Sequence, residues 1–147
     1  MMGLKTSYYK NMLISLKRGG YKGVLSKAKP LFYLAIFKGI EEGWIMGNKI
    51  KYDKQIEKVY LEFYKMYDPQ SKPAPFSKPF YHSTGESFYD IHWKEGKIPE
   101  HKWHTPSGKF LIDHCEYAYF DDGLWELLQD SESREELRNT IINHYLR

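Results

Sequence analysis

Hydrophobic side chains in the first half of the chain recur at helical spacing in three segments. These segments cover residues 6–18, 30–42 and 53–67. The second segment is apolar around nearly its whole circumference, so we expect it to form the central core helix. Pro30 suits the first turn of that helix and Gly43 its end, while Asp53 can cap the start of the third helix.

Proline and glycine replace this pattern between residues 68 and 108. Four prolines, at positions 69, 73, 75 and 79, predict an extended loop rather than a helix. Residues 80–82 and 87–93 have the composition of strands around a turn at 84–86, and residues 94–108 predict a long loop. Earlier in the chain, residues 44–46 and 49–52 have the pattern of a short two-stranded wing.

The last third of the chain returns to helical signals. Residues 108–115 predict a short helix and residues 117–120 an extended segment. Asp122 can cap the helical turn that follows, and Ser133 with Glu136 has the spacing of a capping box for a final helix. The whole pattern predicts one helix-rich α+β domain over residues 1–147, with about five helices and a small antiparallel sheet or wing.

The composition is typical of a soluble globular domain rather than of a disulfide-stabilised or membrane-spanning protein. Hydrophobic residues make up 41% and charged residues 28% of the 147 residues, so folding needs neither a disulfide nor a metal. The longest apolar run, residues 31–37, is far shorter than the roughly 20 residues that span a bilayer. The single cysteine, Cys115, fits a reducing compartment, and no signal peptide is recognisable. We therefore expect a cytoplasmic protein without membrane contact.

The net charge of +3 conceals a strong asymmetry along the chain. Residues 1–78 carry 15 Lys and Arg against 6 Asp and Glu, whereas residues 79–147 carry 7 against 13. A surface that meets a polyanion leaves this kind of electrostatic pattern. A solvated lysine-rich surface without a ligand produces the same pattern, so charge alone leaves both interpretations open.

The sequence lacks the motifs of the common enzyme classes. It contains no phosphate-binding loop of the GxxxxGK[ST] type, no GxGxxG and no GxSxG. His101 with His104, and His114 with Cys115, have metal-like spacing, but a structural zinc site needs four ligands, preferably with several thiolates. Asp113 with His114 could begin the hairpin of a His-metal nuclease, yet no suitably spaced Asn and second His follow. We therefore expect no catalytic residue, no metal and no cofactor.

Basic residues gather with aromatic residues and prolines in two parts of the first half. Lys17, Arg18, Lys22, Lys27 and Lys29 lie in or beside one loop together with Tyr21, and the proline-rich segment adds Lys72 and Lys78. Lysine and arginine neutralise phosphates and release counterions, while ring and proline faces add apolar contacts. Phe80 and Tyr81 are equally well explained as core residues.

Four blocks of the sequence, in order over residues 10–146, resemble one known family. They are residues 29–36 (KPLFYLAI) with 42–43 and 48–50, residues 78–82 (KPFYH) with 85–89 (GESFY), residues 113–128 (DHCEYAYFDDGLWELL), and residues 134–146. Together they are similar to the sulfur-binding domain that precedes HNH nuclease domains in phosphorothioate-dependent restriction endonucleases.

This resemblance implies binding of double-stranded DNA whose backbone carries sulfur in place of a non-bridging oxygen. Carried over by position, Pro79 would be the pocket proline, flanked by Phe80, Tyr81 and His82. The expected phosphate contacts are Lys17, Arg18, Lys22, Lys27, Lys29 and Lys78. The family's nuclease domain has no counterpart in residues 1–147, so we expect a DNA-binding module of restriction or defence type, with a separate nuclease subunit as a candidate partner. The alternative is a non-catalytic protein-interaction subunit of a nuclease or defence complex, with exposed tyrosines as anchors.

Overall fold

The computed structural model describes residues 2–21, 24–96 and 105–147. The elements follow in the order α1 (Met2–Leu13), β1 (Gly20–Tyr21), β2 (Val24–Leu25), α2 (Ala28–Glu42), α3 (Lys54–Tyr67), α4 (Ser77–His82), the 3₁₀ turn η1 (Ser83–Gly85), β3 (Tyr89–Trp93), the turn η2 (Lys94–Gly96), α5 (Gly108–His114), β4 (Cys115–Phe120), α6 (Asp122–Leu128) and α7 (Ser131–Tyr145). The α+β class is confirmed. The described parts of the chain contain seven α-helices rather than about five, because α4 and α6 are complete short helices.

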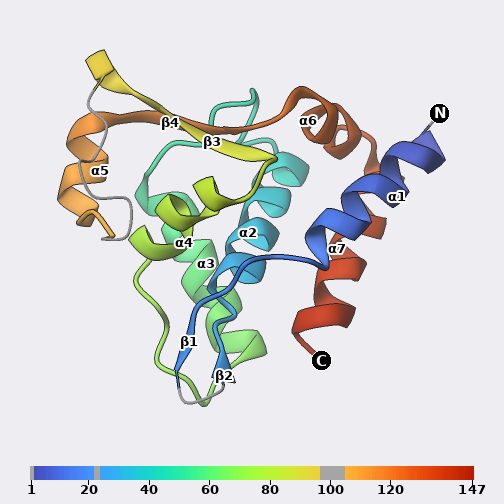
Figure 1. Cartoon of the computed structure of the whole chain (residues 1–147), viewed down its shortest axis with the longest axis horizontal. Helices are drawn as coiled ribbons and strands as arrows, with labels where there is room; N and C mark the ends of the chain where they lie inside the picture. Colours follow the sequence, from blue (N-terminus) through green and yellow to red (C-terminus); the bar gives the residue numbers. More distant parts are fainter. Residues whose placement is uncertain (1, 22–23, 97–104) are drawn as a thin grey trace.

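Helix α2 forms the centre of the molecule, as its apolar circumference predicted. Its residues from Ala28 to Phe37 are all buried, and Gly43, with φ 84°, ends it in the left-handed conformation that favours glycine. Helices α3 and α4 pack on one side of α2 and α7 on the other, with α1 lying against α7 (Figure 1). Edge-to-face rings, including the pair Phe32 and Phe76 with centroids 5.6 Å apart, fill the space between α2 and α4.

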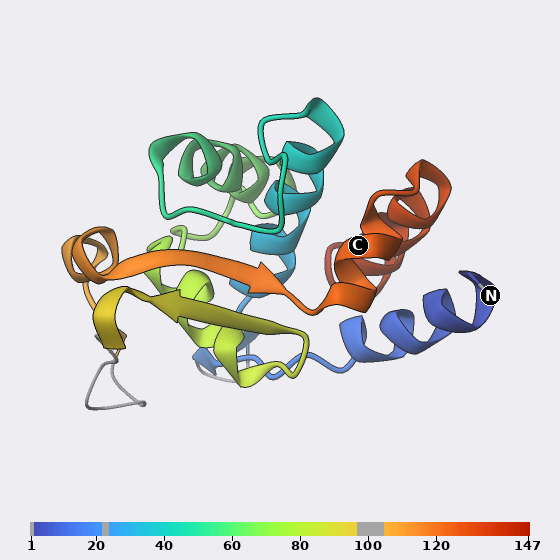
Figure 2. The same cartoon turned by 90° about the horizontal axis from the view of Figure 1, so that it is seen from above.

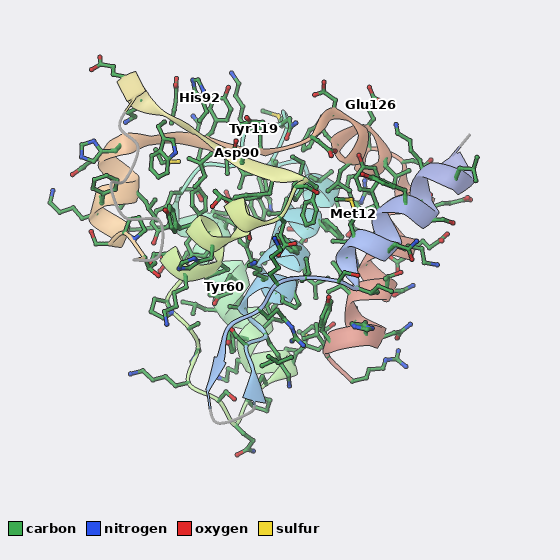
Figure 3. All side chains as sticks on the ribbon, viewed as in Figure 1. Met12, Tyr60, Asp90, His92, Tyr119 and Glu126 are labelled. Carbon is green, nitrogen blue, oxygen red and sulfur yellow. The ribbon has the colours of Figure 1, made fainter. Side chains whose placement is uncertain are left out.

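The larger sheet consists of β3 and β4, which pair antiparallel from Tyr89↔Phe120 to Trp93↔Cys115 with a register shift between His92 and Trp93. Along β3 the burial alternates as expected for a strand with one face on the core, and Asp90 and His92 point outward (Figure 3). Figure 2 shows α5 at one end of this sheet and α1 with α7 at the other.

The predicted wing over residues 44–52 is wrong. Ile50 makes only an isolated bridge to Ala118 of β4, and the second antiparallel pair of the described chain is β1 with β2. The predicted strand at residues 80–82 is also wrong, because these residues belong to α4. Pro79 is tolerated there because it lies in the first turn, where backbone N–H groups have no partner within the helix.

Helix ends follow the predicted chemistry with small shifts in position. Asp53 caps α3 as predicted, and its carboxylate accepts hydrogen bonds from the amides of Gln55 and Ile56, each at 3.1 Å. Asp121 rather than Asp122 caps α6, and Asp130 rather than Ser133 caps α7. Helix α1 ends at Leu13 instead of residue 18, which frees the following basic residues for a loop.

Folding brings the acidic second half of the chain onto part of the basic first half. Lys5 and Lys10 of α1 form salt bridges with Glu126 and Glu136, at 3.1 and 3.2 Å. A pair of the opposite sense joins Arg138 of α7 to Glu41 at the end of α2. Among the described cations, Lys17, Arg18, Lys27, Lys72 and Lys78 take no part in these pairs. None of the described helices is long and apolar enough to cross a membrane.

Candidate functional site

A basic concavity with a volume of about 1100 Å³ lies in the described part of the chain. It lies between the loop and β1–β2 hairpin that follow α1, the start of α2, the end of α3, the proline-rich segment and α4 (Figure 1). We call it the basic basin. Its charged lining residues among those described are the cations Lys17, Arg18, Lys27, Lys29, Lys72 and Lys78, and one carboxylate, Asp68.

Most of the residues predicted from the sequence meet in this basin. Five of the six predicted phosphate-binding residues line it, and the sixth, Lys22, lies outside the described residues. Pro79 and His82 line it as well, whereas Phe80 and Tyr81 do not. Cations that are 61 positions apart along the chain, from Lys17 to Lys78, therefore share one concave surface.

Lys72 and Lys78 are the most available cations of the basin. Both side chains are exposed, and neither forms a hydrogen bond or salt bridge with another described residue. Helix α3 holds the segment that carries them. The Tyr60 hydroxyl donates to the Ala74 carbonyl at 2.8 Å, and the centroids of the Phe76 and Tyr60 rings are 5.5 Å apart. Two exposed ammonium groups are thus carried by a segment that is held against α3.

Lys29 has a different role from the one predicted, because its ammonium group is already engaged. It is buried and lies 2.8 Å from the carboxylate of Glu86, and it donates to the Lys17 carbonyl at 2.5 Å. Glu86 also accepts from the Lys17 amide at 2.9 Å. This buried ion pair fastens the loop after α1 to α2 and to the end of η1, and so holds Lys17 at the rim of the basin.

Arg18 is likewise held by neighbouring groups. Its guanidinium donates to the Ser26 carbonyl at 3.1 Å and lies 4.5 Å from the centroid of the Tyr145 ring, in cation–π distance. Lys27 is freer, because its ammonium is 4.0 Å from Asp68 and both side chains are partly exposed. The Lys17 ammonium donates only a long hydrogen bond, at 3.4 Å, to the Gly85 carbonyl. Among the described cations that line the basin, Lys17, Lys27, Lys72 and Lys78 are therefore the ones best able to meet an anion.

Apolar groups form part of the basin beside these cations. Pro79 and Ala28 are largely buried, and both line the basin. Leu25 of β2, which is 52% exposed, lines it as well. His82 closes one side and shares a hydrogen bond of 2.7 Å with the Thr105 hydroxyl. Burial lowers the pKa of His82 from 6.5, and the positive charges of Lys29 and Lys78 lower it further, so the imidazole is neutral near pH 7.

The predicted pocket role of Phe80 and Tyr81 needs correction. The Phe80 side chain is completely buried and packs against the rings of Phe32 and Phe76, each at 5.8 Å. Tyr81 is also buried and lies near Trp93. Both belong to the core, which is the alternative that the sequence left open.

The structure offers little for metal or thiol chemistry in the regions it describes. No group of three or more His, Cys, Asp or Glu side chains is placed to hold a metal ion among the described residues, and His101 and His104 lie outside them. Burial raises the pKa of Cys115 to about 12, so its thiol stays protonated.

Sequence reasoning missed three groups that shape the basin: Glu86, Asp68 and Thr105. Each gains its role from a partner far along the chain, such as Lys29, 57 positions before Glu86, and no local pattern marks such a pair.

No family model matches the chain, and no curated protein matches it either.

Proposed function

We propose that this protein binds double-stranded DNA through the basic basin, as a non-catalytic module of restriction or defence type. The observation that supports this most is the convergence of six cations and one carboxylate on a single concave surface. Lysine and arginine side chains arranged in this way neutralise backbone phosphates and release their counterions, which supplies affinity independent of sequence. The four cations without strong internal partners are the ones we assign to phosphates.

The apolar part of the basin supports the further proposal that a sulfur-bearing phosphate is preferred. Sulfur is larger and less strongly hydrated than oxygen, so an apolar surface gains by covering it and loses by stripping water from an oxygen. Pro79 lies between Lys78 and His82 in the sequence, and all three residues line the basin. The resemblance to sulfur-binding domains likewise implies that Pro79 is the proline that contacts the sulfur atom.

Gel-shift measurements with plain, methylated and phosphorothioate duplexes of one sequence test this proposal. We expect binding to all three at low salt, with the phosphorothioate duplex bound most tightly. An absence of binding to any of them would reject the proposed function, whereas equal affinity for all three would reject only the preference for sulfur.

The substitution Pro79→Ala is expected to reduce the preference for the phosphorothioate duplex and to change affinity for the plain duplex little. The ring supplies apolar surface near the sulfur, whereas the phosphate contacts come from lysines that remain. Pro75→Ala is the matched control, because Pro75 is an exposed proline of the same segment outside the basin lining. If Pro79→Ala weakens both duplexes equally, the sulfur pocket is not at this proline.

His82 is expected to report on an anion in the basin through its own titration. In the free protein its pKa lies below 6.5, so protonation costs stability, and the stability of the fold should fall as the pH decreases below that value. A bound phosphate opposes the charges of Lys29 and Lys78 and should raise the pKa of His82. NMR titration of the imidazole with and without a DNA duplex measures the shift, and an unchanged value in the saturated complex would remove the phosphate from this side.

A further inference from the structure

A second basic pocket lies where β4 meets α5. Its volume is about 410 Å³, and no described residue lines both this pocket and the basic basin. Lys49, Lys51 and Lys94 supply its positive charge, and Glu116 is the one carboxylate among its described lining residues. We call it the β4–α5 pocket. Its size falls within the range of small-molecule sites, roughly 300–1,000 Å³.

The backbone holds Lys49 and Lys51 on the same side of an extended segment. Ile50, between them, is buried, and it exchanges two backbone hydrogen bonds with Ala118 of β4, both at 2.7 Å. Because side chains alternate along an extended chain, the two lysines both face away from the side that buries Ile50. Figure 2 shows this segment, between α2 and α3, running beside β4.

Lys94 reaches the same pocket through an irregular end of β3. The register shifts between His92 and Trp93, and Glu95 has φ 47° and ψ 37°, a left-handed conformation that is unfavourable for a residue with a Cβ. Such departures cluster at functional sites, where the surrounding structure maintains them. Here they lie on both sides of the one lysine that β3 and η2 contribute to the pocket.

Positive charge in this pocket is poorly compensated. None of the three ammonium groups forms a salt bridge or hydrogen bond with another described residue, and that of Lys49 makes a cation–π contact at 5.2 Å from the centroid of the Tyr117 ring. Glu116 is itself 3.1 Å from the His92 imidazole. Elsewhere Lys5, Lys10 and Lys38 each pair with a carboxylate. Three like charges around one concavity create a local potential that favours an anion.

We propose that the β4–α5 pocket binds a phosphate group, independently of the basic basin. Lysine ammonium groups recognise phosphate as point charges, and three of them can surround one phosphate from different directions. The phosphate belongs either to a nucleic-acid backbone or to a small phosphorylated molecule. This proposal depends only on the β4–α5 pocket. It would remain valid if the basic basin did not bind DNA.

Titration with inorganic phosphate, followed by the backbone amide NMR signals of Cys115, Glu116 and Tyr117, tests the proposal. Saturable shifts are expected in the native protein, and the double variant Lys49→Gln/Lys94→Gln should weaken the response by about tenfold. The control Lys54→Gln/Lys58→Gln removes the same charge from exposed positions of α3 outside both pockets, and it should leave the response unchanged.

Equal responses from the two double variants, or shifts that never saturate, would overturn the proposed site. Titration with a short DNA duplex then identifies the source of the phosphate. Shifts of the same amides with the duplex indicate a nucleic-acid backbone, and shifts with inorganic phosphate alone indicate a small phosphorylated molecule. A variant of the basic basin that loses DNA binding but keeps the phosphate response would separate this site from the proposed function.

Discussion

Replacing Lys72 and Lys78 together by alanine is expected to weaken binding to a short DNA duplex by roughly ten- to a hundredfold at low salt. Both ammonium groups are exposed at the basic basin and have no ionic partner among the described residues, so each is free to neutralise a phosphate. Because the variant neutralises fewer phosphates, its binding also releases fewer counterions from the DNA. The slope of log affinity against log salt concentration should therefore become shallower by about two, which fluorescence anisotropy at several salt concentrations measures.

The double variant Lys54→Ala/Lys58→Ala provides the matched control. It removes the same charge from exposed lysines of α3 that do not line the basin. Its affinity should fall only slightly and its salt slope should remain that of the native protein. If both double variants lower the slope by the same amount, the lysines act only through overall charge and the basin is not the contact surface.

Breaking the buried pair of Lys29 and Glu86 is expected to lower the free energy of unfolding by about 3–5 kcal/mol. In Lys29→Met the carboxylate of Glu86 loses its ammonium partner while it remains buried, and in Glu86→Gln the ammonium loses its counter-charge. Urea denaturation measures both variants. The double variant Lys29→Met/Glu86→Gln should be less destabilised than the sum of the single variants, because it leaves no unpaired buried charge.

The exposed pair of Lys38 and Glu42, at 2.9 Å on one face of α2, is the control for this prediction. Lys38→Met should leave the free energy of unfolding almost unchanged, as usual for an exposed i,i+4 pair. The opposite result would be a loss of less than about 1 kcal/mol of unfolding free energy in Lys29→Met, with the effects of Lys29→Met and Glu86→Gln simply adding in the double variant. It would show that the pair does not hold the loop after α1.

The elements predicted correctly from the sequence carry strong local signals. The apolar run at residues 31–37 and the glycine at position 43 define α2, and the Asp53 cap defines the start of α3. The strand predicted at residues 80–82 fails because its aromatic composition suits a strand as well as a buried helix. Contacts of Phe76 and Phe80 with Phe32 of α2, more than 40 positions away, favour the helix.

That correction also explains which of the predicted pocket residues line the basin. Along a strand, Pro79 and Tyr81 would share one face, with Phe80 and His82 on the other. In helix α4, Lys78 and His82 are four positions apart and share a face, and both line the basin, while Phe80 turns into the core. Pro79 and His82 therefore line the basin although the secondary structure of this segment was predicted wrongly.

The roles of individual cations were less predictable than their location. Cations of the basic loop and of the proline-rich segment were assigned to one set of expected phosphate contacts, and described cations from both segments line the basin. Nothing local distinguished Lys29, which is buried against Glu86, from Lys27, which remains partly exposed. Such distinctions depend on partners from distant parts of the chain, so they need the structure.

Chemical-shift mapping with a short duplex tests the binding surface most directly. On addition of DNA to the native protein, we expect the largest changes at amides around Ser26, Lys27, Ser71, Lys72 and Lys78. The face formed by α1, α6 and α7, where Lys5 and Lys10 are paired with Glu126 and Glu136, should change little. Changes concentrated on that paired face, or none at a DNA concentration that saturates a gel shift, would contradict DNA binding through the basic basin.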